Sequence, residues 1–233
     1  MNRSLPRPRA GLLALALCVL AGGPVRGAAY PQAEPTDPEQ QMVELMNRGR
    51  SNPAAEAARY GIGLNDGLAA GTLSNFTRQP LASHPALLNS ARTHSQWILD
   101  TGTFSHTGSG GSNAGQRMVD AGYVFSGNWT WGENLSANAD VEEAHAALFR
   151  SASHRESLLN PSFDEVGPGL KHGNFLDEPT LISTLDFARS GSTPGPVVTG
   201  VVYFDFDTDG AYDAGEGIGG VTASANGTTW TAT

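Results

Sequence analysis

Three short segments in the middle of the chain contain the residues that decide our prediction of the fold: FSH at 104–106, WGENL at 131–135 and SHR at 153–155. They include His106, Glu133 and His154, three side chains able to carry a proton or bind a metal ion, set among small and apolar neighbours. Their spacings of 27 and 21 residues exclude a metal motif formed within one helix, such as HExxH. We therefore expect the fold to bring these three residues into one cleft.

The first 29 residues have the pattern of a secretory signal peptide. A basic start is followed by an apolar run from Leu12 to Leu20 and by small residues at 27–29. This run is too short to span a bilayer, and no later segment qualifies as a membrane helix. We expect the mature protein to be secreted to the extracellular space or the periplasm, without an integral membrane segment.

Cysteine content and charge exclude several classes of function. Cys18 is the only cysteine, so removal of the signal would leave none for disulfides, thiolate catalysis or a cysteine-based zinc site. Loss of the signal's four arginines would also change the formal net charge from −9 to −13. Because so acidic a surface repels phosphates and anionic lipids, we expect no nucleic-acid partner.

Capping and periodicity signals predict three helices before the central stretch. The first begins at DPEQ (37–40) with Asp37 as N-cap, and the second runs from Asn52-Pro53 to Tyr60. A third, from about 84 to 100, has apolar residues at helical spacing. His94 falls on its buried face, either as a core histidine or as a support for the cleft.

Helices and strands alternate in the second half of the chain. We expect a short helix at 116–121 and then a strand that reaches Glu133. Asp140 begins a further helix that should end near 151–153, which leaves His154 at a helix terminus or turn. Two more strands are predicted near 166–170 and 180–188.

Composition divides the chain into five parts. A Gly-, Ser- and Pro-rich stretch at 190–196 marks a domain boundary, and the following residues lack a helical period. A β-sandwich usually needs about 70–100 residues, so the last module looks incomplete. The expected parts are a signal peptide (1–29), a linker (30–36), a main domain (37–189), a second linker (190–196) and a partial all-β module (197–233).

Residues 38–190 resemble the CAP superfamily of cysteine-rich secretory proteins, antigen 5 and pathogenesis-related proteins, in its bacterial branch. The resemblance is carried by seven segments in order: LMNRGRSNP (45–53), FSH (104–106), 117–123, GENL (132–135), SHRESLL (153–159), FDEVG (163–167) and LDF (185–187). It implies an α/β fold, a three-layer α-β-α sandwich with a cleft built around two histidines and acidic residues. His106 and His154 match the cleft histidines and Glu133 the glutamate of the GEN segment. Eukaryotic members have a further glutamate where this chain has Ala152, so a four-residue catalytic set cannot be carried over.

The chemistry of the three cleft residues leaves two interpretations open. Two neutral imidazoles with a carboxylate are ligands that zinc or another divalent metal accepts, and His106 and His154 are the expected metal ligands. The same groups are also suited to general acid and base work without metal. For Glu133, a structural role beside a turn remains an alternative.

The C-terminal segment contains a calcium-type pattern. Its carboxylates fit the spacing D-x-D-x-D-G-x5-E and comprise Asp205, Asp207, Asp209, Asp213 and Glu216. The flanking residues suit strands rather than the helices of an EF-hand, and the segment resembles the start of calcium-binding B-type repeats of bacterial surface adhesins. The alternative is a solvated acidic turn.

Three functional hypotheses follow. The first is a non-enzymatic exported protein that binds a small molecule, lipid, peptide or metal in a cleft lined by His106, Glu133, His154 and His94. The second is a metal-dependent extracellular hydrolase of peptide or envelope material, for which the chain shows no GxSxG nucleophile motif. The third is a structural surface adhesin. The sequence identifies neither the ligand nor the oligomeric state.

Overall fold

The computed structural model describes residues 34–191, 199–225 and 228–231. The predicted signal peptide at 1–29, with Cys18, lies outside these residues, as do most of the two predicted linkers. Among the described residues, no helix is long and apolar enough to cross a membrane.

A four-stranded mixed sheet forms the centre of the main domain. Its strands are β1 (Ala82–Ser83), β2 (Thr130–Asn138), β3 (Glu165–Phe175) and β4 (Glu178–Arg189), in the order β1-β3-β4-β2. β1 pairs parallel with β3, and the other neighbours are antiparallel. β2 is therefore an edge strand, and its residue Glu133 lies directly opposite Asp186 of β4.

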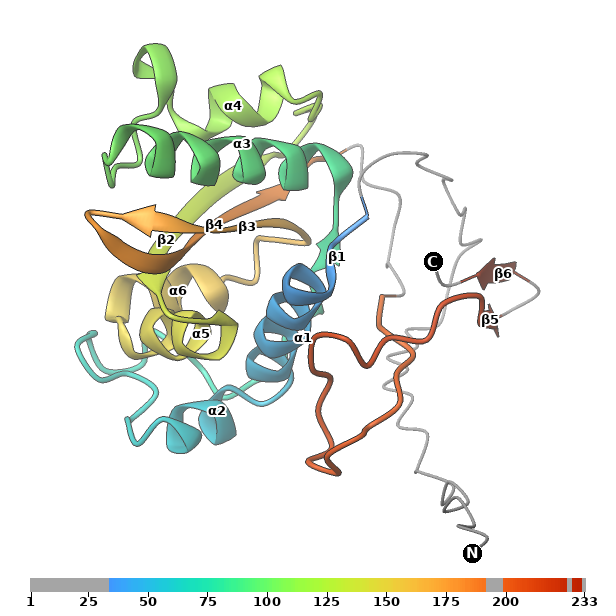
Figure 1. The fold of residues 1–233 in the computed structure, drawn as a ribbon. Coiled ribbons are helices and arrows are strands. Elements are labelled where there is room, and N and C mark those ends of the chain that lie inside the picture. The colour runs from blue at the N-terminus through green and yellow to red at the C-terminus, as the bar shows by residue number, and fades with distance from the viewer. Residues whose placement is uncertain (1–33, 192–198, 226–227, 232–233) are drawn as a thin grey trace, which may run out of the picture.

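Helices cover both faces of this sheet, which gives the expected three-layer α-β-α arrangement (Figure 1). One face carries α3 (Pro85–Thr101) and α4 (Ala114–Asp120). The other carries α1 (Asp37–Ser51), α5 (Val141–Arg150) and α6 (Ala152–Leu158), with α2 (Pro53–Arg59) beside α1. The α/β fold class and the layer order predicted from the sequence are confirmed.

Two glycines allow α3 to lie directly on the sheet. A Cβ atom at Gly167 would lie 2.0 Å from the backbone of Leu87, and one at Gly169 would lie 2.2 Å from the backbone of Ala91. A side chain at either position would force α3 away from β3. This close contact fixes the helix that carries Ser90 and His94 against the strands that carry the candidate site.

The larger hydrophobic core lies between the sheet and the α1/α5/α6 layer. It includes Met42, Met46, Leu148, Phe149 and Phe187, all of which are 2% exposed or less. Burial of each such side chain stabilises the fold by about 1.5–3 kcal/mol. The opposite layer has two smaller apolar clusters.

Three local predictions were wrong, each because of a capping residue. α1 begins one residue earlier than expected, since Thr36 is the N-cap and its N–H donates to Glu39 at 2.8 Å. α4 begins at Ala114 because Asn113 and Gln116 form a capping box. Ser151 is the single non-helical residue between α5 and α6. His154 therefore lies inside α6 rather than at the end of α5 or in a turn.

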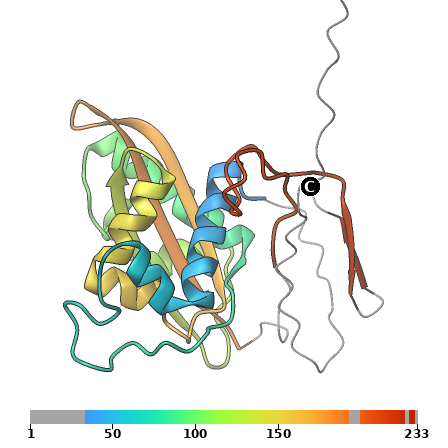
Figure 2. The same ribbon diagram turned by 90° about the horizontal axis from the view of Figure 1, so that it is seen from below.

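The C-terminal segment contains little regular structure. A single bridge joins Tyr203 and Gly217, and β5 (Thr222–Ala225) pairs with β6 (Thr228–Thr231). The segment contacts α1, where the Gln41 side-chain amide donates to Asp213 at 2.7 Å (Figure 2). The described residues of this segment form no sandwich, and an adhesin-type repeat stays a prediction.

Candidate functional site

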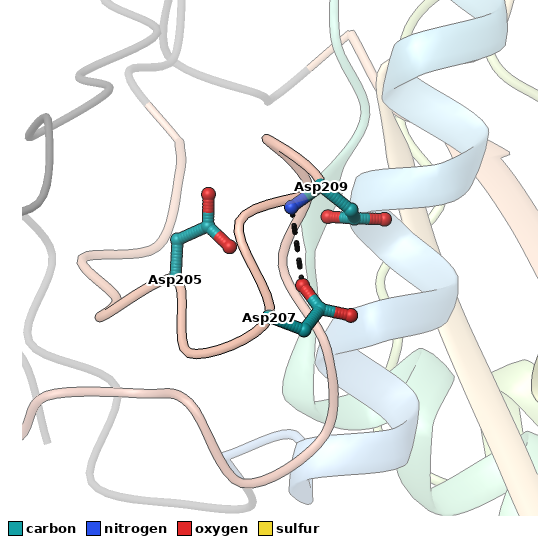
Figure 3. Close-up of side chains that lie close together, drawn as sticks. All are labelled: Asp205, Asp207 and Asp209. Atoms are coloured by element: carbon teal, nitrogen blue, oxygen red, sulfur yellow. Dashed lines mark hydrogen bonds between the residues drawn. The ribbon is translucent and has the colours of Figure 1, made fainter.

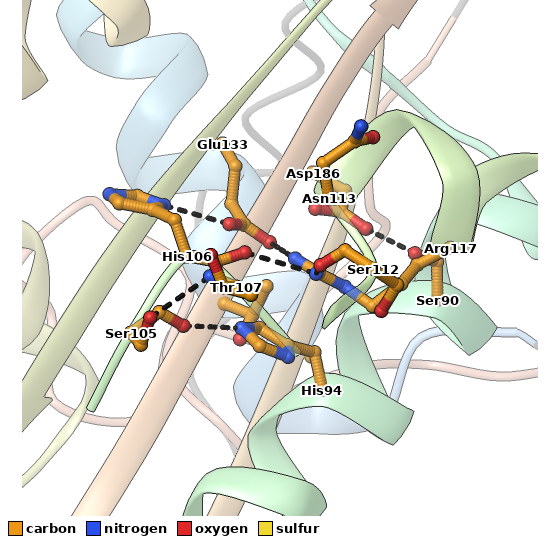
Figure 4. Close-up of polar contacts among 12 residues, drawn as sticks. Ser90, His94, Ser105, His106, Thr107, Ser112, Asn113, Arg117, Glu133 and Asp186 are labelled. Carbon is orange, nitrogen blue, oxygen red and sulfur yellow. Dashed lines mark hydrogen bonds and ion pairs between the residues drawn. The ribbon is translucent and has the colours of Figure 1, made fainter. Parts of the chain in front are cut away.

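The candidate site is centred on the Glu133 carboxylate, which binds two partners at once (Figure 4). One oxygen lies 2.8 Å from Nδ1 of His106, and the other pairs with the guanidinium of Arg117. The Glu133 side chain is only 2% exposed. A carboxylate so deeply buried needs such partners, because an unpaired buried charge is costly.

Strand alternation and α4 together bring these groups into contact. Glu133 lies on the face of β2 that meets α3 and α4, where Arg117 projects from α4. The Arg117 guanidinium also donates to the carbonyl oxygens of His106 and Ser112, at 3.1 and 3.0 Å. One arginine therefore holds both Glu133 and the loop that presents His106.

Asp186 is a buried acid of this site that sequence reasoning did not assign. It lies opposite Glu133 in the sheet, is fully buried and accepts a hydrogen bond from the Ser90 hydroxyl at 2.6 Å. Burial, and then the neighbouring Glu133, raise the pKa of Asp186 well above its usual value. The available signal was an aspartate within the apolar run LISTLDFA, which burial makes unfavourable without a specific role.

His106 is the part of this network that reaches solvent. Its side chain is 61% exposed, whereas Glu133 and Arg117 beneath it are 2% and 9% exposed. Glu133 accepts the hydrogen bond at Nδ1, and no described residue bonds Nε2 of the same ring. The imidazole is thus oriented from below, and its second nitrogen is turned outward.

His94 supports the site from inside the α3 layer. The residue is 1% exposed, its Nε2 lies 2.9 Å from the carbonyl oxygen of Ser105, and its ring stacks on Trp97 at 5.5 Å. Burial lowers the pKa of His94, which favours the neutral ring. The structure places it against the backbone next to His106, so it positions that loop and does not line an open surface.

His154 comes from the other side of β2. Asn134, which alternates with Glu133 along the strand, donates to the carbonyl oxygen of His154 at 3.0 Å and so ties α6 to the sheet. The Ser151 hydroxyl lies 2.8 Å from Nδ1 of His154. Burial, and then the charge of His106, lower the pKa of His154, so the two histidines interact electrostatically. No hydrogen bond among the described residues joins His154 to Glu133 or His106.

Of the three predicted cleft residues, the structure therefore brings only two into direct contact. His106 and Glu133 are in direct contact, and His154 approaches from across the edge strand. Within the described part of the chain, the one group of three acidic or histidine side chains close enough to share a metal ion is Asp205, Asp207 and Asp209. His106, Glu133 and His154 are not such a group, and of the two histidines only His106 is oriented by Glu133.

Three carboxylates of the acidic C-terminal loop lie together, those of Asp205, Asp207 and Asp209 (Figure 3). One oxygen from each of Asp205, Asp207 and Asp209 lies within 4.8 Å of the others. Asp213 binds Gln41 instead, and Glu216 accepts from the backbone N–H groups of Phe206 and Asp213. Gly210, at the sixth position of the pattern, has a φ of +81°, which allows the sharp turn that calcium loops make there.

Comparison with known proteins identifies the family. The profile of the CAP family (cysteine-rich secretory protein family) matches residues 43–187, which is more than half of the chain. The chain therefore belongs to the CAP family, as the sequence resemblance implied.

Individual relatives match over shorter stretches. YkwD of Bacillus subtilis (strain 168) is 32% identical over 103 residues, which cover 42% of this chain and 39% of YkwD. An extracellular protein containing a SCP domain from Bacillus anthracis is 27% identical, with a TM-score of 0.41 over 48% of this chain and 35% of that one. An outer surface protein of Borrelia burgdorferi is 24% identical, with a TM-score of 0.40 over 47% of this chain and 77% of that one. The chain spans about two fifths of the curated relative it matches.

Proposed function

We propose that this protein is an exported CAP-domain binding protein whose cleft at His106, Glu133 and His154 holds a small ligand, peptide, lipid or metal without catalytic turnover. The carrying observation is the 2.8 Å contact between Glu133 and Nδ1 of His106, which fixes an exposed imidazole on a buried support. Ala152 stands where eukaryotic relatives have a further glutamate, which favours binding over catalysis. The bacterial relatives described as extracellular or outer-surface proteins support export.

The donor types of His106 and His154 are those that a divalent transition metal such as zinc accepts. Histidines that bind metal commonly donate their other ring N–H to a carboxylate, which fixes the tautomer and the ring orientation. Glu133 and His106 have this arrangement, so Nε2 of His106 is the atom available to a metal, with Nε2 of His154 as a second ligand. A metal bound there would supply Lewis acidity and open positions for an outside ligand.

A calorimetric zinc titration tests this cleft. We would compare the wild-type protein with the double variant His106→Ala/His154→Ala, and with His172→Ala as a control because His172 is exposed on β3. Stoichiometric binding that the double variant loses and the control retains is the expected result. Equal binding by all three proteins would show that the metal binds elsewhere, and no binding by any of them would leave the cleft as a site for an organic ligand.

A metal-dependent hydrolase is the second candidate, favoured by one contact. The Ser151 hydroxyl lies 2.8 Å from Nδ1 of His154, which is the distance of a nucleophile and its base. No carboxylate among the described residues orients His154 in turn, and this weakens the candidate. Hydrolysis of peptide or envelope material that needs added metal and disappears in His106→Ala and Ser151→Ala would support it.

We further propose that the loop from Asp205 to Glu216 binds calcium. Three clustered carboxylates repel one another until a hard cation neutralises them, and Gly210 has the conformation that the pattern requires. Asp213 and Glu216 would complete the ligand set by exchanging their present hydrogen bonds for the ion.

Calcium titration with Asp205→Asn/Asp209→Asn, against Asp177→Asn as a matched control in the β3–β4 turn, tests this loop. Binding lost in the first variant and kept in the second is expected.

A purely structural adhesin, the third candidate, would keep its attachment to surfaces after substitution of all three cleft residues.

A further inference from the structure

A second concave surface lies beside the candidate site, between α4 and the start of β2. Its volume is about 490 Å³, within the range of small-ligand sites. Aromatic rings of Phe125, Trp129 and Trp131 line it together with the polar side chains of Asn113, Gln116 and Asp120. We call these six residues the aromatic groove.

The two tryptophan rings of the groove are exposed and held in place. Trp129 is 54% exposed and Trp131 is 38% exposed, although tryptophan is usually among the more buried residues. The rings of Phe125 and Trp129 lie 5.2 Å apart at 50°. Trp131 packs on Gly115, where a Cβ atom would lie 2.7 Å from the indole nitrogen, so only glycine permits this close approach. These contacts hold the two indole rings in place while part of each ring stays exposed to solvent.

The polar groups of the groove have defined hydrogen-bonding roles. The side-chain oxygens of Asn113 and Gln116 accept from each other's backbone N–H at 2.9 Å, forming the cap of α4. Their NH₂ groups remain as donors, while the exposed Asp120 carboxylate is an acceptor. Asp120 is also the one charged side chain among the residues that line the groove, on a protein of net charge −9, which opposes anionic ligands.

We propose that the aromatic groove binds a neutral oligosaccharide. A pyranose ring has an apolar C–H face that suits an indole surface, and a rim of hydroxyls that both donate and accept hydrogen bonds. The amide groups of Asn113 and Gln116 would donate to these hydroxyls, and Asp120 would accept from one. A proline-rich peptide, the other common occupant of aromatic grooves, fits less well because proline has no N–H to offer Asp120.

Calorimetric titration with soluble chitin and cellulose oligosaccharides tests this proposal on the wild type and three variants. Trp129→Ala removes an exposed ring, Gly115→Ala displaces Trp131, and Phe76→Ala removes a 79% exposed ring outside the groove. We expect saturable binding of at least one series, weakened about tenfold or more in the first two variants and unchanged in Phe76→Ala. Circular dichroism would establish that the variants remain folded.

Two outcomes would overturn the proposal. The first is the absence of saturable binding to either series, or binding that Trp129→Ala leaves unchanged. The second is tighter binding of a polyproline peptide with the same dependence on Trp129, which would assign the groove to a peptide. Because the groove does not include His106 or His154, the double variant of the cleft should bind sugar normally, so failure here is distinguishable from failure of the cleft.

Discussion

Two clusters of histidine, glutamate and arginine lie on opposite faces of the sheet, and they differ in access to solvent. In the cluster on the α3/α4 face, which we call the open cluster, Glu133 and Arg117 are buried beneath an exposed His106. In the cluster on the other face, which we call the closed cluster, His145 is fully buried, with its Nδ1 2.9 Å from the Tyr60 hydroxyl and Glu56 nearby.

The second cluster has the residue types of a catalytic site but no exposed member among its histidine and carboxylate. Glu56 is 2% exposed and bound to Arg48 at 2.7 Å, so the group ties α1, α2 and α5 together. The comparison shows that residue types alone do not distinguish a functional site from a buried cluster that only stabilises the fold. What separates them is whether the histidine of the network is presented to solvent, as His106 is and His145 is not.

The largest expected effect comes from removing the acid beneath His106. Glu133→Ala leaves Arg117 buried without its charge partner and should lower the free energy of unfolding by about 3–5 kcal/mol. Urea denaturation would measure it, with Glu178→Ala on the exposed start of β4 as the matched control. A loss below about 1 kcal/mol would mean that Glu133 and Arg117 are solvated, and the contrast between the clusters would fail.

The closed cluster should respond to acid. Burial lowers the pKa of His145 to about 4, against about 6.5 in the unfolded chain. Between pH 4 and pH 6.5, His145 is protonated in the unfolded chain but stays neutral in the folded protein. The free energy of unfolding is therefore highest above pH 6.5 and falls as the pH drops to 4. The contribution lost is about 3 kcal/mol.

The variant His145→Gln tests this assignment. Glutamine can still bond the Tyr60 hydroxyl but does not titrate, so its stability should fall less steeply between pH 6.5 and 4 than that of the wild type. His172→Gln removes an exposed histidine instead and should keep the wild-type slope. Identical slopes in all three proteins would place the titrating group elsewhere.

Asp186 offers an effect of opposite sign that sharpens the description of the open cluster. Since burial and Glu133 raise the pKa of Asp186, the folded protein favours the neutral acid, and Asp186→Asn replaces it by a neutral side chain of the same shape. The unfolded wild-type chain ionises Asp186 as the pH rises, so the wild type loses stability that the non-titrating asparagine variant keeps. We therefore expect the two proteins to be equally stable at low pH and Asp186→Asn to be the more stable one at pH 7. A loss above about 2 kcal/mol would show that Asp186 is ionised.

The sequence predicted the elements and the motif residues of the site better than the partners that hold those residues in place. Capping and periodicity located α3 almost to the residue, and motif spacing selected His106 and Glu133. Arg117 and Asp186 were not assigned, because their roles depend on pairing between β2 and β4 and on where α4 lies. Such contacts join residues far apart in the chain, and no local pattern records them.

The smallest effect on stability should come from the residue most directly exposed to ligands. His106→Ala removes a 61% exposed ring, and exposed ion pairs contribute about 0–1 kcal/mol, so unfolding should change by less than that amount. Under the proposed function, the same variant should also lose zinc binding. A residue whose loss abolishes binding at nearly unchanged stability belongs to a site, whereas His145 should show the reverse. If His106→Ala instead destabilised the protein as much as Glu133→Ala, His106 would belong to the supporting network, and the open cluster would differ from the closed one only in degree.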